Sequence, residues 1–165
     1  MPRVNPELKI KELEELKAII SQKRAAGAKI VFANGCFDLL HAGHVRYLES
    51  AREMGDVLIL GLNSDASVEA IKGKGRPIQS EAHRAEILAS LDCVDYVLVF
   101  DLPTVDGVLK ELSPDVHAKG TDYTEETVPE RETVRAYGGH VAIAGDPKNH
   151  STRDLIQTIL TKFRS

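Results

Sequence analysis

Two hydrophobic patterns alternate along the chain. Between residues 6 and 26, leucine and isoleucine return every three or four positions with Lys and Glu between them, which predicts an amphipathic helix that ends at Gly27. Residues 29–34 form a short, apolar, β-branched run that is typical of a buried strand. The same reasoning predicts further helices over residues 43–54, 80–91, 102–112 and 129–137 and a last one capped by Ser151, and further strands over residues 56–62, 96–100, 115–119 and 140–144.

This order of elements predicts the fold class. Strands joined by helices at this spacing imply right-handed crossovers and a parallel sheet covered on both faces. We therefore expect an α/β fold, a Rossmann-like three-layer α/β/α arrangement with about five parallel strands. The N-terminal helix, over residues 1–27, is expected to pack on the main domain, over residues 28–165. Ligands of such sheets bind beyond the carboxyl ends of the strands, and the long irregular stretch over residues 120–128 suggests a functional role.

Composition narrows the class of protein. The 165 residues, 42% apolar and 28% charged, have the size and composition of one soluble globular domain with its own core. Lys and Arg against Asp and Glu give 21 − 25 = −4, so we expect neither a nucleic-acid nor a membrane partner. Cys36 and Cys93 have no metal or redox spacing, and no apolar run approaches the ~20 residues of a membrane span. The charged start is not a signal peptide, and we expect a cytoplasmic protein.

The most informative segment runs from Asn34 to His44, Asn-Gly-Cys-Phe-Asp-Leu-Leu-His-Ala-Gly-His, at a strand-to-helix turn. Gly35 allows the backbone to approach a ligand closely, and the free N–H groups of the following helix form an anion site. His41 and His44 are three residues apart, so both rings project to one side of the first turn. Two imidazole donors beside a helix N-terminus suit phosphate oxygens. A capping histidine plus a packing histidine would explain either residue, but not the pair with its glycines.

Two other chemistries are conceivable at this turn. A zinc site is disfavoured, because the zincin pattern spaces its histidines four apart with a glutamate after the first. A Cys36 nucleophile with a neighbouring histidine as its base predicts that Cys36→Ser abolishes activity, whereas phosphate chemistry predicts a mild effect.

Several basic residues have both a structural and a functional interpretation. Lys119 ends a buried strand, a costly place for an ammonium group unless it faces an anion, so we predict a phosphate ligand there. The Lys72–Arg76 loop alone is typical of a solvated surface turn, and Ser151 of an ordinary helix cap. The remaining histidines have no motif support and are expected at the surface or in packing; they are His83, His117, His140 and His150.

With this segment the sequence resembles the cytidylyltransferase-like nucleotidyltransferases, whose hallmark is the His-x-Gly-His motif, here His41-Ala-Gly-His44. The resemblance covers nearly everything from Ile30 to Leu160. Within that superfamily the chain is most similar to the bacterial heptose 1-phosphate nucleotidyltransferases, on the segments Asn34–Asp38 and Lys119–Tyr123.

The resemblance implies roles for particular residues. His41 and His44 would be catalytic and would stabilise the charge that develops around the α-phosphate. The nucleotide would contact Gly35, Cys36, Phe37, His41, His44, Ser151 and Thr152. Phosphate or acceptor contacts would come from Asn34, Asp38, Asn63, Asp65, Lys74, Arg76, Arg84, Lys119 and Asp122. Arg153 departs from the hydroxyl residue that the family often has at that position. No protein-held metal is expected; magnesium would arrive on the ATP or other NTP.

The implied reaction joins AMP from ATP to a sugar 1-phosphate, D-glycero-D-manno-heptose 1-phosphate, and releases pyrophosphate. The alternatives are a cytidylyltransferase acting on glycerol 3-phosphate or another polyol phosphate, and a non-catalytic nucleotide-binding regulator. The expected partners are these small molecules, a separate heptose kinase that supplies the acceptor, and a second copy of the chain in a homodimer.

Overall fold

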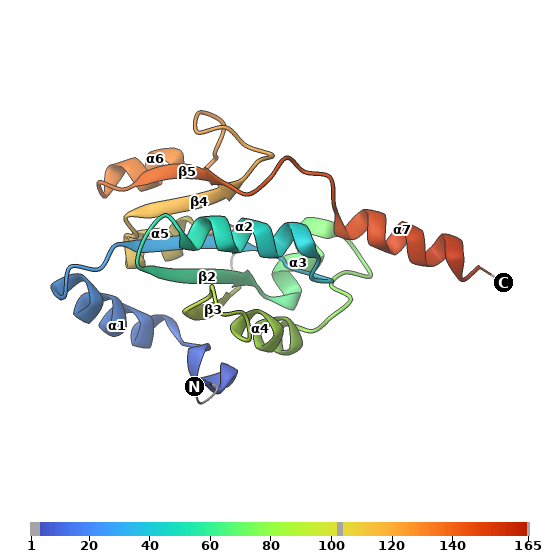
Figure 1. Ribbon diagram of the computed structural model, residues 1–165, viewed down its shortest axis with the longest axis horizontal. Coiled ribbons are helices and arrows are strands. Elements are labelled where there is room, and N and C mark those ends of the chain that lie inside the picture. Colours follow the sequence, from blue (N-terminus) through green and yellow to red (C-terminus); the bar gives the residue numbers. More distant parts are fainter. Residues whose placement is uncertain (1–3, 102–103, 165) are drawn as a thin grey trace.

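A five-stranded parallel sheet forms the centre of the molecule, in a computed structural model that describes residues 4–101 and 104–164 (Figure 1). The strand order is β3-β2-β1-β4-β5, so the order reverses on either side of β1. The strands are β1 (Ile30–Gly35), β2 (Val57–Asn63), β3 (Tyr96–Phe100), β4 (Val116–Gly120) and β5 (His140–Ala144). The predicted α/β class with its parallel sheet is confirmed, and β3 and β5 have the predicted bounds.

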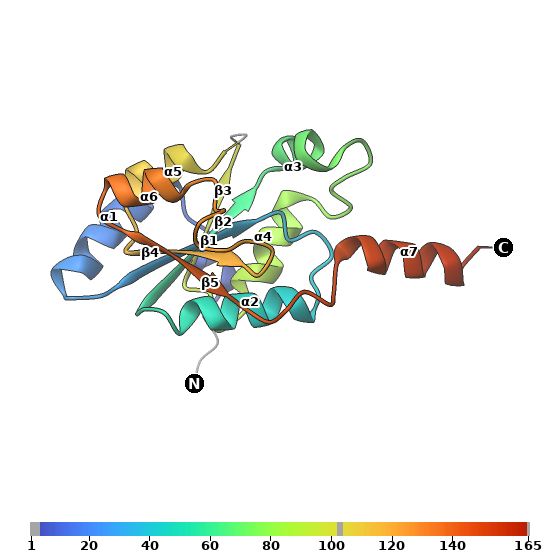
Figure 2. The ribbon, with the colours of Figure 1, turned by 90° about the horizontal axis from the view of Figure 1, so that it is seen from above.

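Helices cover both faces of the sheet, which completes the three layers (Figure 2). The described helices are η1 (Pro6–Lys9), α1 (Leu13–Ala25), α2 (Ala42–Arg52), α3 (Asp65–Lys72), α4 (Glu81–Ala89), α5 (Asp106–Leu112), α6 (Arg131–Ala136) and α7 (Thr152–Lys162). Buried side chains of α2 and α4 pack on one face, and those of α1, α5 and α6 pack on the other. From α1 these are Leu16 and Ile20, both at most 2% exposed.

The single helix predicted over residues 6–26 is wrong, because an extended segment divides it. After η1, Ile10 forms a parallel bridge with Val97, and the Lys11 N–H donates to the Val97 carbonyl at 2.9 Å. The Lys9 ammonium also donates to the carbonyls of Leu91 and Val94. Because β3 is an edge strand, its outer backbone groups need partners, and satisfying them outweighs the local helical pattern.

The sequence reasoning missed α3 altogether. Ser64 caps this helix by accepting from the Ser67 N–H at 3.1 Å, and Gly73 ends it with a φ of 95°. The helix predicted over residues 102–112 begins only at Asp106, and residues 102 and 103 lie outside the described residues. The cap predicted at Ser151 is confirmed, because its hydroxyl accepts from the Asp154 N–H at 3.1 Å.

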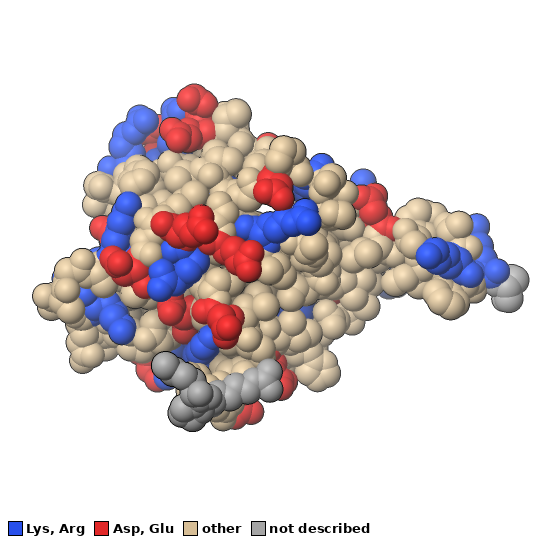
Figure 3. Space-filling view, viewed as in Figure 1, with Lys and Arg blue, Asp and Glu red and all other residues tan. Residues whose placement is uncertain are grey.

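The last helix, α7, projects away from the sheet (Figures 1 and 2). None of its residues is buried, and its apolar side chains Leu155, Ile159 and Leu160 are exposed. On the face shown in Figure 3, acidic and basic side chains are intermixed over the sheet, so no broad basic surface forms there. Over residues 4–101 and 104–164, no helix is both long and apolar enough to cross a membrane.

Candidate functional site

A cavity of about 740 Å³ opens at the carboxyl ends of β1, β4 and β5, between the first turns of α2 and α7. This is the place that the reversal of strand order predicts. The structure brings twelve of the predicted site residues to its wall: Asn34, Gly35, Cys36, Phe37, Asp38, His41, His44, Arg76, Lys119, Asp122, Ser151 and Thr152. Four others do not line it: Asn63, Asp65, Lys74 and Arg84.

His41 and His44 stand together at the start of α2. His41 is the N-cap residue, and its backbone N–H donates to Nδ1 of His44 at 3.3 Å. The two rings are stacked, with centroids 3.7 Å apart and planes 20° apart. A Cβ at Gly43 would lie 3.0 Å from the His41 ring, so the glycine of the motif makes room for that ring.

Both imidazoles are uncharged at neutral pH. Burial, followed by the nearby His41 and the Lys148 ammonium, lowers the pKa of His44 to about 3. Burial, with His150 and Lys148, also lowers the pKa of His41. Since Nδ1 of His44 accepts a hydrogen bond, its proton lies on Nε2, which leaves a neutral N–H donor for a ligand in the cavity.

The turn between β1 and α2 has an unusual backbone. Phe37 and Leu39 have φ angles of 47° and 51°, in the left-handed region that non-glycine residues seldom adopt. The Phe37 ring is held edge-on to His44 at 5.2 Å and stacks on Tyr47 at 6.4 Å. Such backbone conformations persist only where surrounding contacts enforce them. Here the contacts of the Phe37 ring hold the turn in place, and the turn positions His41 and His44.

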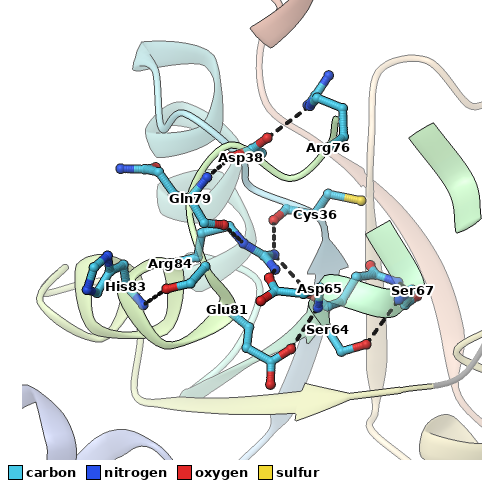
Figure 4. A network of polar contacts seen from close by, with 12 residues as sticks. Cys36, Asp38, Ser64, Asp65, Ser67, Arg76, Gln79, Glu81, His83 and Arg84 are labelled. Atoms are coloured by element: carbon cyan, nitrogen blue, oxygen red, sulfur yellow. Dashed lines mark hydrogen bonds and ion pairs between the residues drawn. The ribbon is translucent and has the colours of Figure 1, made fainter. Parts of the chain in front are cut away.

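Asp38 is buried behind this turn and binds the chain itself (Figure 4). Its carboxylate accepts from the Ile78 and Gln79 N–H groups and from Arg76 Nε, at 2.7, 3.0 and 2.9 Å. Burial alone would raise the pKa of Asp38, but the N–H groups of Gln79 and Ile78 and the guanidinium of Arg76 together hold it below its usual value. Asp38 thus ties residues 36–41, the turn between β1 and α2 that we call the histidine turn, to the loop before α4.

Arg84 lies on α4 and is 1% exposed (Figure 4). Whereas Asp38 accepts from backbone N–H groups, Arg84 donates to backbone carbonyl oxygens. Its guanidinium donates to the carbonyl oxygens of Cys36, Asn63 and Gln79 at 2.7, 2.8 and 2.9 Å and pairs with Asp65 at 2.8 Å. Four of its five N–H donors are therefore used within the protein, and Arg84 does not line the cavity, so its contact with a phosphate or acceptor stays a prediction from the resemblance.

The other residues away from the cavity also have protein partners or lie in solvent. Asn63, at the end of β2, donates to the Ser67 hydroxyl at 2.8 Å, and the Asp65 backbone N–H donates to Glu81 at 2.7 Å. Lys74 is exposed on the loop after α3.

Lys119 is nearly buried at the end of β4 and faces the cavity, as its position in the sequence predicted. Its ammonium lies 3.5 Å from Glu130 Oε2 and 4.7 Å from the centroid of the Tyr123 ring. Glu130 Oε2 has no hydrogen-bond partner, so this long ion pair satisfies Lys119 incompletely. A phosphate oxygen in the cavity would complete its coordination. Asp122, in contrast, is paired with Lys148 at 2.5 Å.

The first turn of α7 closes the opposite wall. The Thr152 hydroxyl donates to the Asp38 carbonyl at 2.6 Å, which joins α7 to the histidine turn. Arg153 lines the cavity beside the cap residue Ser151. Sequence reasoning missed the cations Arg46 and Lys148; Lys148 belongs to the short stretch between β5 and Ser151, whose position at a strand's carboxyl end was the available signal.

The alternative chemistries find less support. Burial raises the pKa of the Cys36 thiol, opposed by the charges of Lys72, Arg84 and Arg76, so the thiol stays protonated and is a poor nucleophile. Within the part of the chain that the structure describes, no group of three or more His, Cys, Asp or Glu residues could hold a metal ion.

The buried histidines make stability depend on pH. The pKa of His117 is also lowered to about 3 by burial, against 6.5 in the unfolded chain. Between these values the unfolded chain binds more protons, so the free energy of unfolding falls as pH falls below 6.5. We expect His117 alone to account for about 2 kcal/mol of the loss between pH 7 and 5. Urea unfolding at both pH values, with His117→Leu as comparison, measures it; equal losses in the two proteins would contradict it.

The chain is similar to known proteins in both sequence and structure. A family model described as Cytidylyltransferase-like matches residues 32–161. The bifunctional protein HldE of Geobacter metallireducens is 52% identical over 155 residues, covering 94% of this chain and 32% of that protein. HldE of Pseudomonas paraeruginosa is 50% identical over 150 residues, covering 91% and 32%. The chain thus spans about a third of the length of these curated relatives.

Solved structures give the same architecture. A lipopolysaccharide core biosynthesis protein from Thermoplasma volcanium superposes with a TM-score of 0.60 and 27% identity, covering 71% of this chain and 94% of that one. Pantoate-beta-alanine ligase from Francisella tularensis superposes with a TM-score of 0.64 over 89% of this chain and 72% of its own. Its identity is 17%, so this likeness concerns the fold alone.

Proposed function

Because the chain belongs to the cytidylyltransferase-like family, we propose that it is a nucleotidyltransferase that moves AMP from ATP to a sugar 1-phosphate, D-glycero-D-manno-heptose 1-phosphate. The products are pyrophosphate and an ADP-sugar. The observation that carries this proposal is the stacked, neutral His41–His44 pair at the first turn of α2, on the wall of a cavity of about 740 Å³.

In the proposed reaction, the phosphate of the acceptor attacks the α-phosphorus of the nucleotide. A new P–O bond forms from the acceptor oxygen, the bond to the β-phosphate oxygen breaks, and that oxygen leaves with its electron pair as pyrophosphate. The acceptor phosphate carries between one and two negative charges, since its second pKa is about 6, so no general base is required. The protein's part is to place donors where negative charge develops on the α-phosphoryl oxygens.

The chain supplies those donors from four directions. His44 offers Nε2–H, and the free N–H groups at the start of α2 add a positive field. Lys119 approaches from β4, and the first turn of α7 provides N–H groups and the cation Arg153. Arg76, held by Asp38, stands on the remaining side. Together these groups supply the local attraction for a triphosphate that a net charge of −4 lacks.

We propose that Mg²⁺ enters as part of the substrate, bound to the triphosphate, and no step above depends on a protein ligand to it.

The heptose acceptor is supported by the relatives named bifunctional protein HldE and by the Asn34–Asp38 and Lys119–Tyr123 segments. The structural likeness to a lipopolysaccharide core biosynthesis protein agrees with it. We further propose a cytoplasmic homodimer, fed by a separate kinase that makes the sugar 1-phosphate. The exposed apolar side of α7 is the surface such a dimer would cover, and light scattering measures the mass.

A pyrophosphate-release assay with ATP and CTP, each combined with heptose 1-phosphate and glycerol 3-phosphate, tests the substrates. We expect release only with ATP and heptose 1-phosphate. Release only with CTP and glycerol 3-phosphate would transfer the assignment to a polyol-phosphate cytidylyltransferase. ATP binding by calorimetry without release in any combination would indicate a regulator instead of an enzyme. Cys36→Ser should change the rate only mildly, because the thiol is not the nucleophile.

A further inference from the structure

His117 is a fully buried histidine on β4, next to the strand that carries Asn34. Its Nε2 lies 2.8 Å from Oδ1 of Asn34, and its ring tilts against Phe32 with centroids 5.9 Å apart. Nδ1 of the same ring is buried and has no hydrogen-bond partner. His117 belongs to no functional motif, yet its side chain contacts Asn34, a residue of the cavity wall.

The surroundings decide how the proton and the amide are arranged. Among the described residues, Asn34 is the only hydrogen-bond partner of the ring, so there are two possibilities. If the Asn34 amide nitrogen donated to Nε2, the ring proton would sit on Nδ1, buried without an acceptor. If Nε2–H donates to Oδ1, the group without a partner is a lone pair, which costs less than an orphaned N–H. The second arrangement is therefore favoured, with Asn34 Oδ1 turned toward His117.

This arrangement orients the other end of the planar amide. With Oδ1 occupied by His117, the Asn34 amide nitrogen points away from the ring, on a residue that lines the cavity beside Gly35. The reverse orientation would present an oxygen, which repels a phosphate. Among the described residues, none accepts from this nitrogen, so its two N–H groups are available to a ligand.

We propose that His117 is a positioning residue that holds the Asn34 amide with its N–H donors toward the cavity, where they bind a phosphoryl oxygen of the substrate. The inference rests on the proposed function, because it takes the ligand to be a phosphate ester or a triphosphate. It also explains why an imidazole occupies an apolar position where one nitrogen remains unsatisfied. A leucine at this position would bring no unpartnered nitrogen, so the contact with Asn34 explains the histidine better than core packing does.

A double-mutant cycle tests the coupling, using His117→Leu, Asn34→Ala and the pair together. We expect each single variant to raise KM for ATP about tenfold, the worth of one hydrogen bond to a charged group, and to change kcat by less than about twofold. The double variant should be no worse than Asn34→Ala, because His117 acts only through that amide. His117→Gln, which keeps an N–H donor, should restore most of the affinity. Independent effects that multiply in the double variant would overturn the proposal.

Two controls separate positioning from folding. His117→Leu should leave the melting temperature unchanged or higher at pH 7, because it removes an unsatisfied buried nitrogen. If His117→Leu lowers the melting temperature and reduces activity equally in the parent and in the Asn34→Ala variant, the role of His117 is purely structural and the proposal is wrong. The same substitution at the exposed His140, at the start of β5, should alter neither quantity.

Binding of inorganic pyrophosphate by calorimetry distinguishes this inference from the proposed function. If the parent protein releases no pyrophosphate with any nucleotide and acceptor but does bind pyrophosphate, the transferase proposal fails. The double-mutant cycle of His117 and Asn34 can then still be measured, from the dissociation constants for pyrophosphate. If the parent is active but the two substitutions lower the affinity for pyrophosphate additively, the proposed role of His117 is wrong and the transferase proposal stands. A parent that neither binds nor turns over a phosphate ligand removes both.

Discussion

Replacement of His44 by alanine is expected to lower kcat for nucleotidyl transfer by about 10²–10³-fold, the usual cost of removing one placed donor to a developing oxyanion. His44 offers its Nε2–H because Nδ1 is occupied by the His41 backbone N–H. The ring is held between His41, at 3.7 Å, and the edge of Phe37, at 5.2 Å, so the donor is in place before the substrate arrives. Because the interaction strengthens as charge develops, KM for ATP should change far less than kcat.

The matched control for this prediction is His83→Ala. His83 lies on α4 with an exposed side chain and does not line the cavity, so the same substitution there should keep kcat within about twofold, as surface changes usually do. Steady-state pyrophosphate release, with circular dichroism to verify folding, measures both variants. A His44→Ala enzyme that keeps more than a tenth of the parent kcat would contradict the assigned role and leave His41 or Lys119 as the principal donor.

The fold could be predicted where burial alone determines an element. β3 and β5 are short apolar runs between polar turns, and the structure has them at the predicted residues. The predictions of elements that failed did so because contacts between distant parts of the chain decide the local structure. Residues 6–26 have a helical period throughout, but Ile10 leaves the helix because the edge of β3 needs a backbone partner. No local pattern contains that requirement, since Val97 is far away in the sequence.

The candidate site, like the fold, could be predicted from the sequence only in part. The histidine pair and Lys119 could be predicted because a strand's carboxyl end and a helix N-terminus are positions with a known chemical environment. Asp38 and Arg84 have equally suggestive residue types, yet their charged groups face backbone groups of the protein. A sequence shows which donors exist, but not whether a carbonyl oxygen or a ligand oxygen lies opposite them. His117 was missed for the same reason, because only the register of β1 and β4 brings it to Asn34.

Arg84→Met is expected to lower the free energy of unfolding by about 3–5 kcal/mol, the range found when one member of a buried charged network is removed. Methionine fills a similar volume but leaves the carbonyl oxygens of Cys36, Asn63 and Gln79 without their donor. Asp65 loses its ion pair at less cost, because 45% of its side chain is exposed and can be hydrated. Arg84→Lys should recover only part of the loss, since one ammonium group cannot reach all of these oxygens.

Arg135→Met provides the comparison, because Arg135 forms an exposed ion pair with Glu132 at 3.4 Å and its loss should cost at most about 1 kcal/mol. Urea unfolding at pH 7 measures the three variants against the parent. Arg84→Met should also disorder the turn between β1 and α2, because the Cys36 carbonyl that Arg84 binds belongs to that turn, so activity should fall together with stability. If Arg84→Met instead loses substrate affinity at unchanged stability, then Arg84 contacts a phosphate or the acceptor, as the family resemblance implied, and the internal hydrogen bonds are not its principal role.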